Sequence, residues 1–191
     1  MESATLPAPA RPDNRALILK SASQLFAERG FQATTLRDIA GATGANGALV
    51  SYYFGGKEGL REAVLSEKIH NIDHLTELPE TGLEKLQAAL GLLFGQVRSD
   101  PDFHRLAHRA LSENDPFRAR LQETYWQPLL TTLSTLLQGA NPALSPTQTR
   151  VRAQVLLGVL QQYGNNFCFF NNTPDAFEAY VVQDLARALT E

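Results

Sequence analysis

Small and polar residues between positions 35 and 57 suit the binding of a phosphate backbone. Lys57 falls in the first turn of an expected helix, where the helix dipole disfavours a cation. A phosphate at that position would be bound by both the lysine and the free backbone N–H groups. Gly47 and Ala48 open an earlier helix although glycine weakens helices, and small side chains there allow close approach to a flat duplex. The alternative is that Gly47 and Lys57 are ordinary solvent-exposed positions.

The residues around these positions predict a helix–turn–helix. Thr35 and Asp38 have the spacing of a capping box, and apolar residues follow at helical spacing over 36–43. Gly44 suits the left-handed end of that helix, and Asn46 suits the N-cap of a second helix over 47–54. A preceding helix that ends at Gly30 is expected to brace the pair. A longer helix is expected from residue 57 to about residue 78.

Many positions of this segment match a known pattern in register and without gaps: Ala22, Leu25 to Phe31, Ala33 to Thr35, Asp38 to Ala40, Gly44, Tyr53, Phe54, Lys57, Glu58 and Leu60. The segment from about Arg15 to Val64 thereby resembles the DNA-binding domain of TetR/AcrR-family transcriptional regulators. The resemblance implies an all-α protein, with an N-terminal three-helix DNA-binding domain and a C-terminal helical bundle for ligand binding and dimerisation. The chain departs from the family at Leu49 and Ser51, so the operator sequence is not implied.

The expected second helix has two faces. Ala48, Ser51 and Tyr52 share one face with Gly47 and can enter a major groove, whereas Val50 and Phe54 can pack inward. The spacing and the resemblance together predict DNA contacts from Thr35, Arg37, Asn46, Gly47, Ala48, Ser51, Tyr52, Tyr53 and Lys57. A local basic patch is expected from Arg11, Arg15, Arg37 and Lys57.

Net charge does not by itself indicate nucleic-acid binding. The 191 residues carry a formal charge of −3; residues 1–70 hold eight Lys/Arg and seven Asp/Glu, and residues 71–191 hold nine and thirteen. The single cysteine, Cys168, excludes an intramolecular disulfide and suits a reducing cytoplasm. Neither a membrane-spanning run nor a signal peptide is expected, so a cytoplasmic protein without a membrane partner is predicted.

The chain divides into three predicted parts. Residues 1–12, with three prolines, form a disordered arm; residues 13–78 form the DNA-binding domain with its linking helix; residues 79–191 form the ligand-binding and dimerisation domain. Capping residues before prolines predict helices over 83–98, 101–112, 116–137, 146–169 and 174–190. Pro128 is expected to kink the third of these.

Aromatic and polar residues of the C-terminal part are expected to line a cavity for an unidentified small-molecule effector. These residues are Phe94, Phe103, His104, His108, Tyr125, Trp126, Tyr163, Asn166 and Phe167. The alternative is that they are ordinary core residues. The i,i+4 pairs His70/His74 and His104/His108 can share a metal only if further ligands fold nearby, so no metal or cofactor is predicted.

The last two helices carry apolar stripes. One contains Leu156, Val159, Leu160 and Tyr163, with Gly158 and Gly164 beside it, and the other contains Phe177, Tyr180, Val181, Leu185 and Leu189. The resemblance implies that such helices from two chains form a four-helix dimer interface, which would present two DNA-binding domains to a palindromic operator. The alternative is that both stripes serve only the core of one chain.

The leading hypothesis is a homodimeric, ligand-responsive transcriptional regulator that is expected to act as a repressor. A second hypothesis keeps the fold but replaces the small molecule with a protein partner or with no effector. A third hypothesis, an enzyme built on a helical bundle, finds little support, because the sequence contains no glycine-rich phosphate loop, no GxSxG and no motif pairing a nucleophile with a base.

Overall fold

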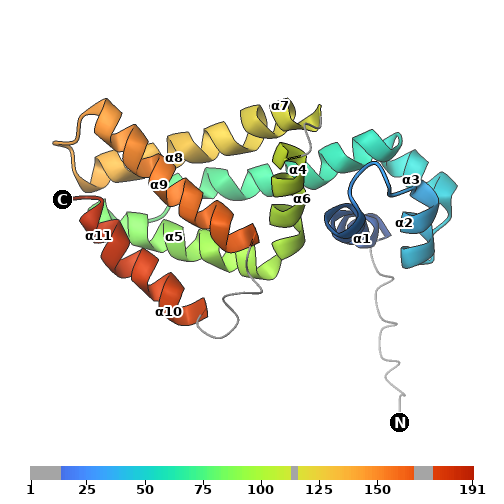
Figure 1. Ribbon diagram of the computed structural model, residues 1–191, viewed down its shortest axis with the longest axis horizontal. Coiled ribbons are helices and arrows are strands. Elements are labelled where there is room, and N and C mark those ends of the chain that lie inside the picture. Colours follow the sequence, from blue (N-terminus) through green and yellow to red (C-terminus); the bar gives the residue numbers. More distant parts are fainter. Residues whose placement is uncertain (1–13, 113–115, 166–173) are drawn as a thin grey trace, which may run out of the picture.

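The computed structural model describes residues 14–112, 116–165 and 174–191, and these ranges are helical and contain no strand (Figure 1). The all-α expectation is therefore confirmed. The predicted arm over residues 1–12, including Arg11, lies outside the described residues.

The helices follow one another with short connections. They are α1 (Asn14–Arg29), α2 (Leu36–Thr43), α3 (Gly47–Phe54), α4 (Lys57–Asp73), the 3₁₀ turn η1 (His74–Thr76), α5 (Gly82–Ser99), α6 (Pro101–Ser112), α7 (Phe117–Leu121), the π-helical turn η2 (Gln122–Trp126), α8 (Gln127–Ala140), α9 (Pro146–Asn165), α10 (Pro174–Ala179), the π-helical turn η4 (Tyr180–Leu185) and α11 (Ala186–Ala188).

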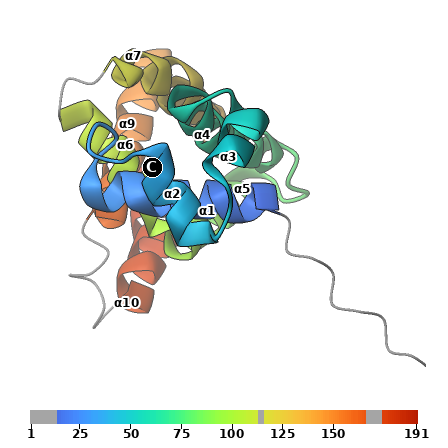
Figure 2. The same cartoon turned by 90° about the vertical axis from the view of Figure 1, so that its right-hand side faces the viewer.

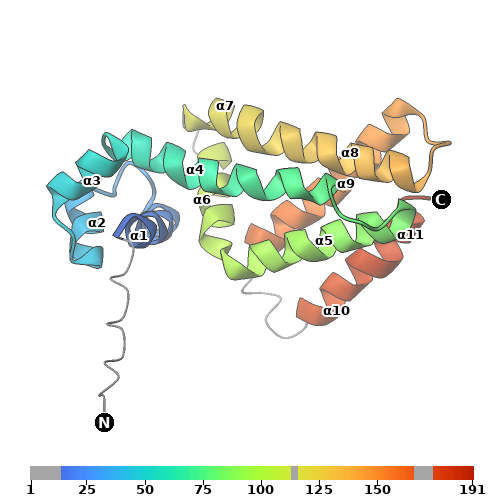
Figure 3. The same ribbon diagram turned by 180° about the vertical axis from the view of Figure 1, so that it is seen from behind.

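The molecule is elongated, with two regions joined by one helix. Helices α1 to α3 form a head at one end, which Figure 2 shows end-on, and helices α5 to α11 form a body. Helix α4 runs from the head into the body, where it contacts η2 and α8 (Figure 3). Helix α1 packs directly on α6, so the head touches the body at a second place. The division into domains at residue 79 stays a prediction, because buried residues of the head and the body form one continuous core.

Several helix starts agree with the capping signals. Helix α6 begins at Pro101, where the Asp100 Oδ1 accepts a hydrogen bond of 3.2 Å from the Phe103 N–H. Helix α9 begins after Ser145, whose hydroxyl accepts from the Gln148 N–H while the Gln148 side chain accepts from the Ser145 N–H. The expected start at Asp115 lies outside the described residues.

Two helix predictions differ from the structure. Helix α4 ends at Asp73 rather than near residue 78, because its last turn tightens into the 3₁₀ turn η1, which is common at helix ends. Where a kink is expected at Pro128, the structure has the wider π-helical turn η2 just before it. The ring of Pro128 would clash with the carbonyl of residue 124 in a regular helix, and a wider turn there leaves room for it.

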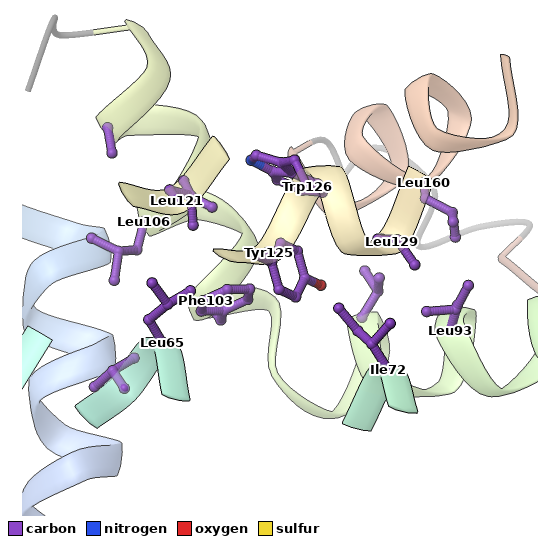
Figure 4. Close-up of a cluster of buried hydrophobic side chains, with 14 of the residues drawn as sticks. Leu65, Ile72, Leu93, Phe103, Leu106, Leu121, Tyr125, Trp126, Leu129 and Leu160 are labelled. Atoms are coloured by element: carbon purple, nitrogen blue, oxygen red, sulfur yellow. The ribbon is translucent and has the colours of Figure 1, made fainter. Parts of the chain in front are cut away.

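The centre of the body is filled by apolar side chains. Figure 4 shows Tyr125 surrounded by Leu65 and Ile72 of α4, Phe103 of α6 and Leu129 of α8. All five side chains are buried. Helix α4 is therefore part of the body's core along its second half, so a movement of α4 would disturb this packing.

Candidate nucleic-acid interface

Local hydrogen bonds build the turn that begins the helix–turn–helix. The Thr35 hydroxyl accepts from the Asp38 N–H at 3.1 Å, and the Asp38 carboxylate accepts from the Thr35 N–H at 2.8 Å, which completes the predicted capping box. The Thr35 hydroxyl also donates to Asp38 Oδ2 at 2.6 Å. This bond, the bond from the Thr35 N–H and the Arg29 guanidinium, 3.8 Å from Asp38, hold the pKa of this carboxyl below its usual value. Gly44 ends α2 with a φ of +66°, in the left-handed region that the sequence predicts.

Helix α3 has the two faces that its sequence predicts. Asn46 caps it by accepting from the Ala48 N–H at 2.9 Å. Val50 and Phe54 are buried, whereas Ala48, Ser51 and Tyr52 are exposed, Tyr52 to 82%. The buried face anchors α3 in the head, and the opposite face presents small and hydrogen-bonding side chains to solvent.

The remaining predicted DNA contacts lie around this helix. Gly47 is half-buried at its start, Tyr53 is exposed beside Tyr52 with ring centres 5.6 Å apart, and Thr35 and Arg37 are exposed at the start of α2. Arg15 is exposed on α1, with its guanidinium 5.5 Å from the centre of the Phe54 ring. The structure thus brings the described members of the predicted set to one end of the molecule, and their contact with DNA stays a prediction.

Lys57 has partners that local sequence patterns do not indicate. Its ammonium donates to the carbonyl oxygens of Phe31 at 2.9 Å, Thr34 at 3.0 Å and Gln32 at 3.4 Å. It also lies 4.4 Å from the centre of the Phe31 ring. Lys57 therefore ties the start of α4 to the turn between α1 and α2, and is not an ordinary solvent-exposed residue. Its contact with a phosphate stays a prediction.

The connection between α3 and α4 depends on a glycine that the sequence analysis missed. A Cβ atom on Gly59 would lie 1.8 Å from the carbonyl oxygen of Phe54. Gly55 and Gly56 of the same connection have positive φ angles of 71° and 127°. The spacing of three glycines within five residues is the signal that indicates a close backbone approach here.

Arg61 joins the head to the body. Its guanidinium lies 3.5 Å from the centre of the Phe31 ring in the head and 4.2 Å from the centre of the Phe117 ring in α7. Only 8% of Arg61 is exposed. A cation held between two aromatic rings away from water is attracted to both. Arg61 of α4 thus contacts a head residue and a body residue at once.

Two further arginines lie near this junction. Arg109 of α6 donates to the carbonyl oxygens of Ala27 at 3.4 Å and Glu28 at 3.3 Å, at the C-terminal end of α1. A cation suits this end of a helix dipole. Arg120 of α7 donates to the Glu62 carboxylate at 3.3 Å. We call Arg61 and Arg109 the head–body arginines; sequence analysis missed them and Arg120 because their partners lie far along the chain.

The predicted ligand residues of the body are only partly brought together. Phe94, Phe103, His104, Tyr125, Trp126 and Tyr163 are buried, and burial raises the pKa of Tyr125. The cavity beside His104, Tyr125 and Trp126 has a volume of about 10 Å³, about the space of a single water. His108 is exposed, because α6 turns its opposite face to the core. The expectation that His108 lines this interior is therefore wrong, and Asn166 and Phe167 lie outside the described residues.

The stripes expected at a dimer interface are mostly internal. Leu156, Leu160 and Tyr163 of α9 are fully buried or nearly so, which corrects their assignment to an interface. The stripe of the last helix is divided, because Val181 is buried and Tyr180 is exposed. Gly164 packs against His104, where a Cβ atom would lie 2.7 Å from the His104 Cβ.

A different apolar face of α9 is open to solvent. Val151, Val155 and Gly158 lie on one side of the helix; the two valines are 53% and 44% exposed, and nothing lies within 4 Å of a Cβ built on Gly158.

No group of three or more His, Cys, Asp or Glu side chains in the described ranges is arranged to hold a metal ion. Within the same ranges, every helix is too short or too polar to cross a membrane.

The head matches a known family. Residues 18–64 match the model for bacterial regulatory proteins of the tetR family. The probable HTH-type transcriptional regulator YttP of Bacillus subtilis is 48% identical over 50 residues, which are 26% of this chain and 24% of YttP. The HTH-type transcriptional repressor Rv3405c of Mycobacterium tuberculosis is 49% identical over 55 residues, or 29% of each chain. The chain thus aligns with less than a third of the length of these relatives.

Solved structures share the whole fold at low identity. A TetR-like transcriptional regulator from Rhodococcus sp. RHA1 is similar with a TM-score of 0.72 and 19% identity, over 94% of this chain and 97% of that one. The fatty acid degradation regulator FadR from Bacillus halodurans gives a TM-score of 0.69 and 21% identity, over 95% and 97%. The head, residues 18–64, thus carries the sequence of the tetR family of bacterial regulatory proteins, and the chain shares its fold with solved TetR-like regulators.

Proposed function

We propose that this protein is a transcriptional regulator that binds double-stranded DNA through the exposed face of α3. The observation that carries the proposal is the division of α3, with Val50 and Phe54 anchored in the head and Ser51 and Tyr52 facing solvent. A short helix held in this way fits a major groove, where hydroxyl groups can reach base edges. The family of the head and the exposed Arg15 and Arg37 beside α3 support the same function.

The regulator acts in this proposal as a homodimer in the cytoplasm, bound to a palindromic operator as a repressor. The exposed face of α9, formed by Val151, Val155 and Gly158, suits a two-fold interface, because small and apolar residues let two identical helices approach closely. Exposed Tyr180 of η4 extends the apolar surface of the last helices. Two heads related by one axis would reach two half-sites of an operator.

A small molecule bound in the body is proposed to release the DNA. Ligand binding can favour one head position over another only if the body contacts the head differently in the two states. The head–body arginines supply such contacts: Arg109 binds the end of α1, and Arg61 lies between Phe31 and Phe117. A shift of α6 or α7 would therefore reach the head directly and change the spacing of the two copies of α3.

DNA titration tests the proposal. The purified protein is titrated onto DNA that contains its own promoter region and onto random DNA of equal length. We expect tighter binding to the promoter DNA, and we expect Tyr52→Ala to weaken it more than Leu92→Ala, which truncates an exposed side chain of α5 outside the proposed dimer interface. Equal affinity for both DNAs contradicts the proposal.

A second candidate is a regulator of the same fold controlled by a protein partner or by no effector. The filled interior beside Tyr125 and Trp126 favours it, because the cavity there has a volume of about 10 Å³, whereas known ligand pockets have volumes of about 300–1,000 Å³. A ligand that binds the folded state raises the melting temperature. Stabilisation by any member of a broad compound library supports small-molecule control, and the absence of stabilisation across that library supports the second candidate.

A further inference from the structure

A cavity of about 410 Å³ lies where the head meets the body. One wall is a single face of α1, with its residues at helical spacing; the second is α4, and the third is the corner between α5 and α6. The lining residues are Ala16, Leu19, Lys20, Ser23, Val64, Glu67, Ser99, Asp100, Pro101 and Asp102. This volume falls within the range of known small-molecule sites. The cavity is separate from the filled interior beside Tyr125.

Ser23 gives this cavity an unused hydrogen-bonding group. Its side chain lines the cavity and is only 5% exposed, and its hydroxyl has no hydrogen-bond partner among the described residues. A buried hydroxyl without a partner costs free energy, so native proteins rarely leave one unsatisfied without a reason. A bound molecule with a hydrogen-bonding group would satisfy it.

The charges of the lining select the chemistry of such a molecule. Glu67, Asp100 and Asp102 bring three carboxyl groups, and Lys20 is the one basic residue of the lining. Burial raises the pKa of Asp102; Arg105, 3.0 Å away, opposes the rise, and Asp100 adds to it. A cation placed beside these carboxylates would favour their charged forms.

The spacing of the carboxylates favours an extended organic cation over a metal ion as the ligand of this cavity. Among the described residues, no three acidic or histidine side chains come together as metal ligands, so these carboxylates do not converge on one point. Groups spread along a cavity with apolar walls from Leu19, Val64 and Pro101 suit an aliphatic chain that carries several ammonium groups.

We propose that the cavity between α1, α4 and the α5–α6 corner binds an aliphatic polyamine. The ammonium groups pair with Glu67, Asp100 and Asp102, one of them donates to the Ser23 hydroxyl, and the methylene groups lie against the apolar walls. The ligand bridges the head and the body, so its binding favours the head position that closes the cavity. This regulatory consequence rests on the proposed DNA-binding function, whereas the binding itself does not.

Calorimetry with the full chain and spermidine tests the binding without DNA. We expect saturable binding that NaCl or MgCl₂ of equal ionic strength does not reproduce. Asp102→Asn should weaken it about fivefold and Glu67→Gln about two- to threefold, since Glu67 is more exposed. Glu84→Gln is the matched control, because Glu84 lies in the first turn of α5, roughly 20 Å from the cavity end of that helix. A spermidine titration without saturable heat, or an equal loss for Glu84→Gln, overturns the proposal.

Ser23→Ala distinguishes a ligand contact from a structural effect. Removal of an unpaired buried hydroxyl should raise the melting temperature of the free protein and weaken spermidine binding at the same time. A raised melting temperature with unchanged spermidine affinity would remove Ser23 from the site. In DNA titrations, spermidine also binds the DNA, and this screening is the same for every protein variant. If spermidine changes the DNA affinity of Asp102→Asn less than that of the unaltered chain, the difference therefore comes from the site on the protein. If the protein fails to bind DNA specifically, the proposed function is wrong, but spermidine binding measured by calorimetry still supports the proposed site.

Discussion

The Lys57 ammonium lies 4.4 Å from the centre of the Phe31 ring and donates a 2.9 Å hydrogen bond to the Phe31 carbonyl oxygen. Lys57→Ala removes the donor from three carbonyl groups, so we expect a loss of about 2 kcal/mol of stability and weaker DNA binding at every sequence. Lys85→Ala in the body is the control.

The salt dependence of DNA binding separates the two roles of Lys57. A direct phosphate contact lowers the slope of log K against log salt concentration by about 0.9 when the lysine is removed. We expect this fall for Lys57→Ala, with a phosphate replacing the Gln32 carbonyl oxygen, which at 3.4 Å is the most distant of the three acceptors of the ammonium. An unchanged slope with weaker binding contradicts the phosphate contact and leaves Lys57 as the residue that positions the turn.

Gly59→Ala should disrupt the connection between α3 and α4, since the new methyl group would lie 1.8 Å from the Phe54 carbonyl oxygen. Backbone atoms cannot yield cheaply, so we expect a loss of about 3 kcal/mol or more, measured by urea unfolding, and weaker DNA binding. Gly91→Ala, at an exposed helical position with nothing within 4 Å, should instead stabilise the protein by up to about 1 kcal/mol. Equal effects of the two substitutions would contradict this account.

Arg61→Ala should destabilise the junction of head and body by about 2–3 kcal/mol, because it removes a nearly buried guanidinium from between Phe31 and Phe117. Arg120→Ala serves as the control, since its pair with Glu62 is solvent-exposed and should contribute at most about 1 kcal/mol. Chemical denaturation measures both. A loss for Arg61→Ala no larger than that for Arg120→Ala would show that the two rings do not hold the arginine.

Acid should weaken the fold through Asp38. Its pKa is lowered from the ordinary value of 3.8, mainly by hydrogen bonds from Thr35, so its stabilising contribution is present above pH 3.8 and is lost as the pH falls through the lower folded value. Asp38→Asn should remove this part of the acid dependence while lowering stability at pH 7. Unfolding midpoints between pH 2.5 and 7 check the prediction, and identical profiles for both proteins would contradict it.

Val155→Glu should convert a dimer into monomers, because it places a charge on the open apolar face of α9. Leu92→Glu is a matched control: Leu92 is 48% exposed on α5, close to the 44% of Val155, and lies outside the proposed interface. Sedimentation velocity measures the molar mass, and promoter binding should weaken with dissociation. A monomeric unaltered chain, or a Val155→Glu variant that stays dimeric, contradicts the proposed interface.

Features set by neighbouring residues were predictable from the sequence. The capping box of Thr35 and Asp38, the left-handed Gly44 and the two faces of α3 depend on contacts within one or two turns. Partners of Lys57 and Arg61 were not predictable, because these side chains bind residues more than twenty positions away, and local spacing carries no information about such pairs.

Helix α9 shows why periodicity could not identify which apolar face stays open to solvent. Leu156 and Leu160 form one apolar face, and Val151 and Val155 form another, so periodicity alone cannot say which face is covered by the chain itself. The small volume of the cavity beside Tyr125 and Trp126 was likewise not predictable from the sequence. Sequence analysis identified residues that gather inside the body, such as Tyr125 and Trp126, but free volume depends on how all their neighbours fit together.

The chain contains a single tryptophan, Trp126, which is 4% exposed beside the small cavity at the heart of the body. Indole fluorescence depends on the polarity of its surroundings, so the native protein should emit at short wavelength from this dry environment. Any event that hydrates or repacks the body would alter the emission of this one fluorophore, and Tyr52 and Tyr53 on α3 contribute no indole signal. The protein therefore carries an intrinsic optical reporter confined to its interior, without any label.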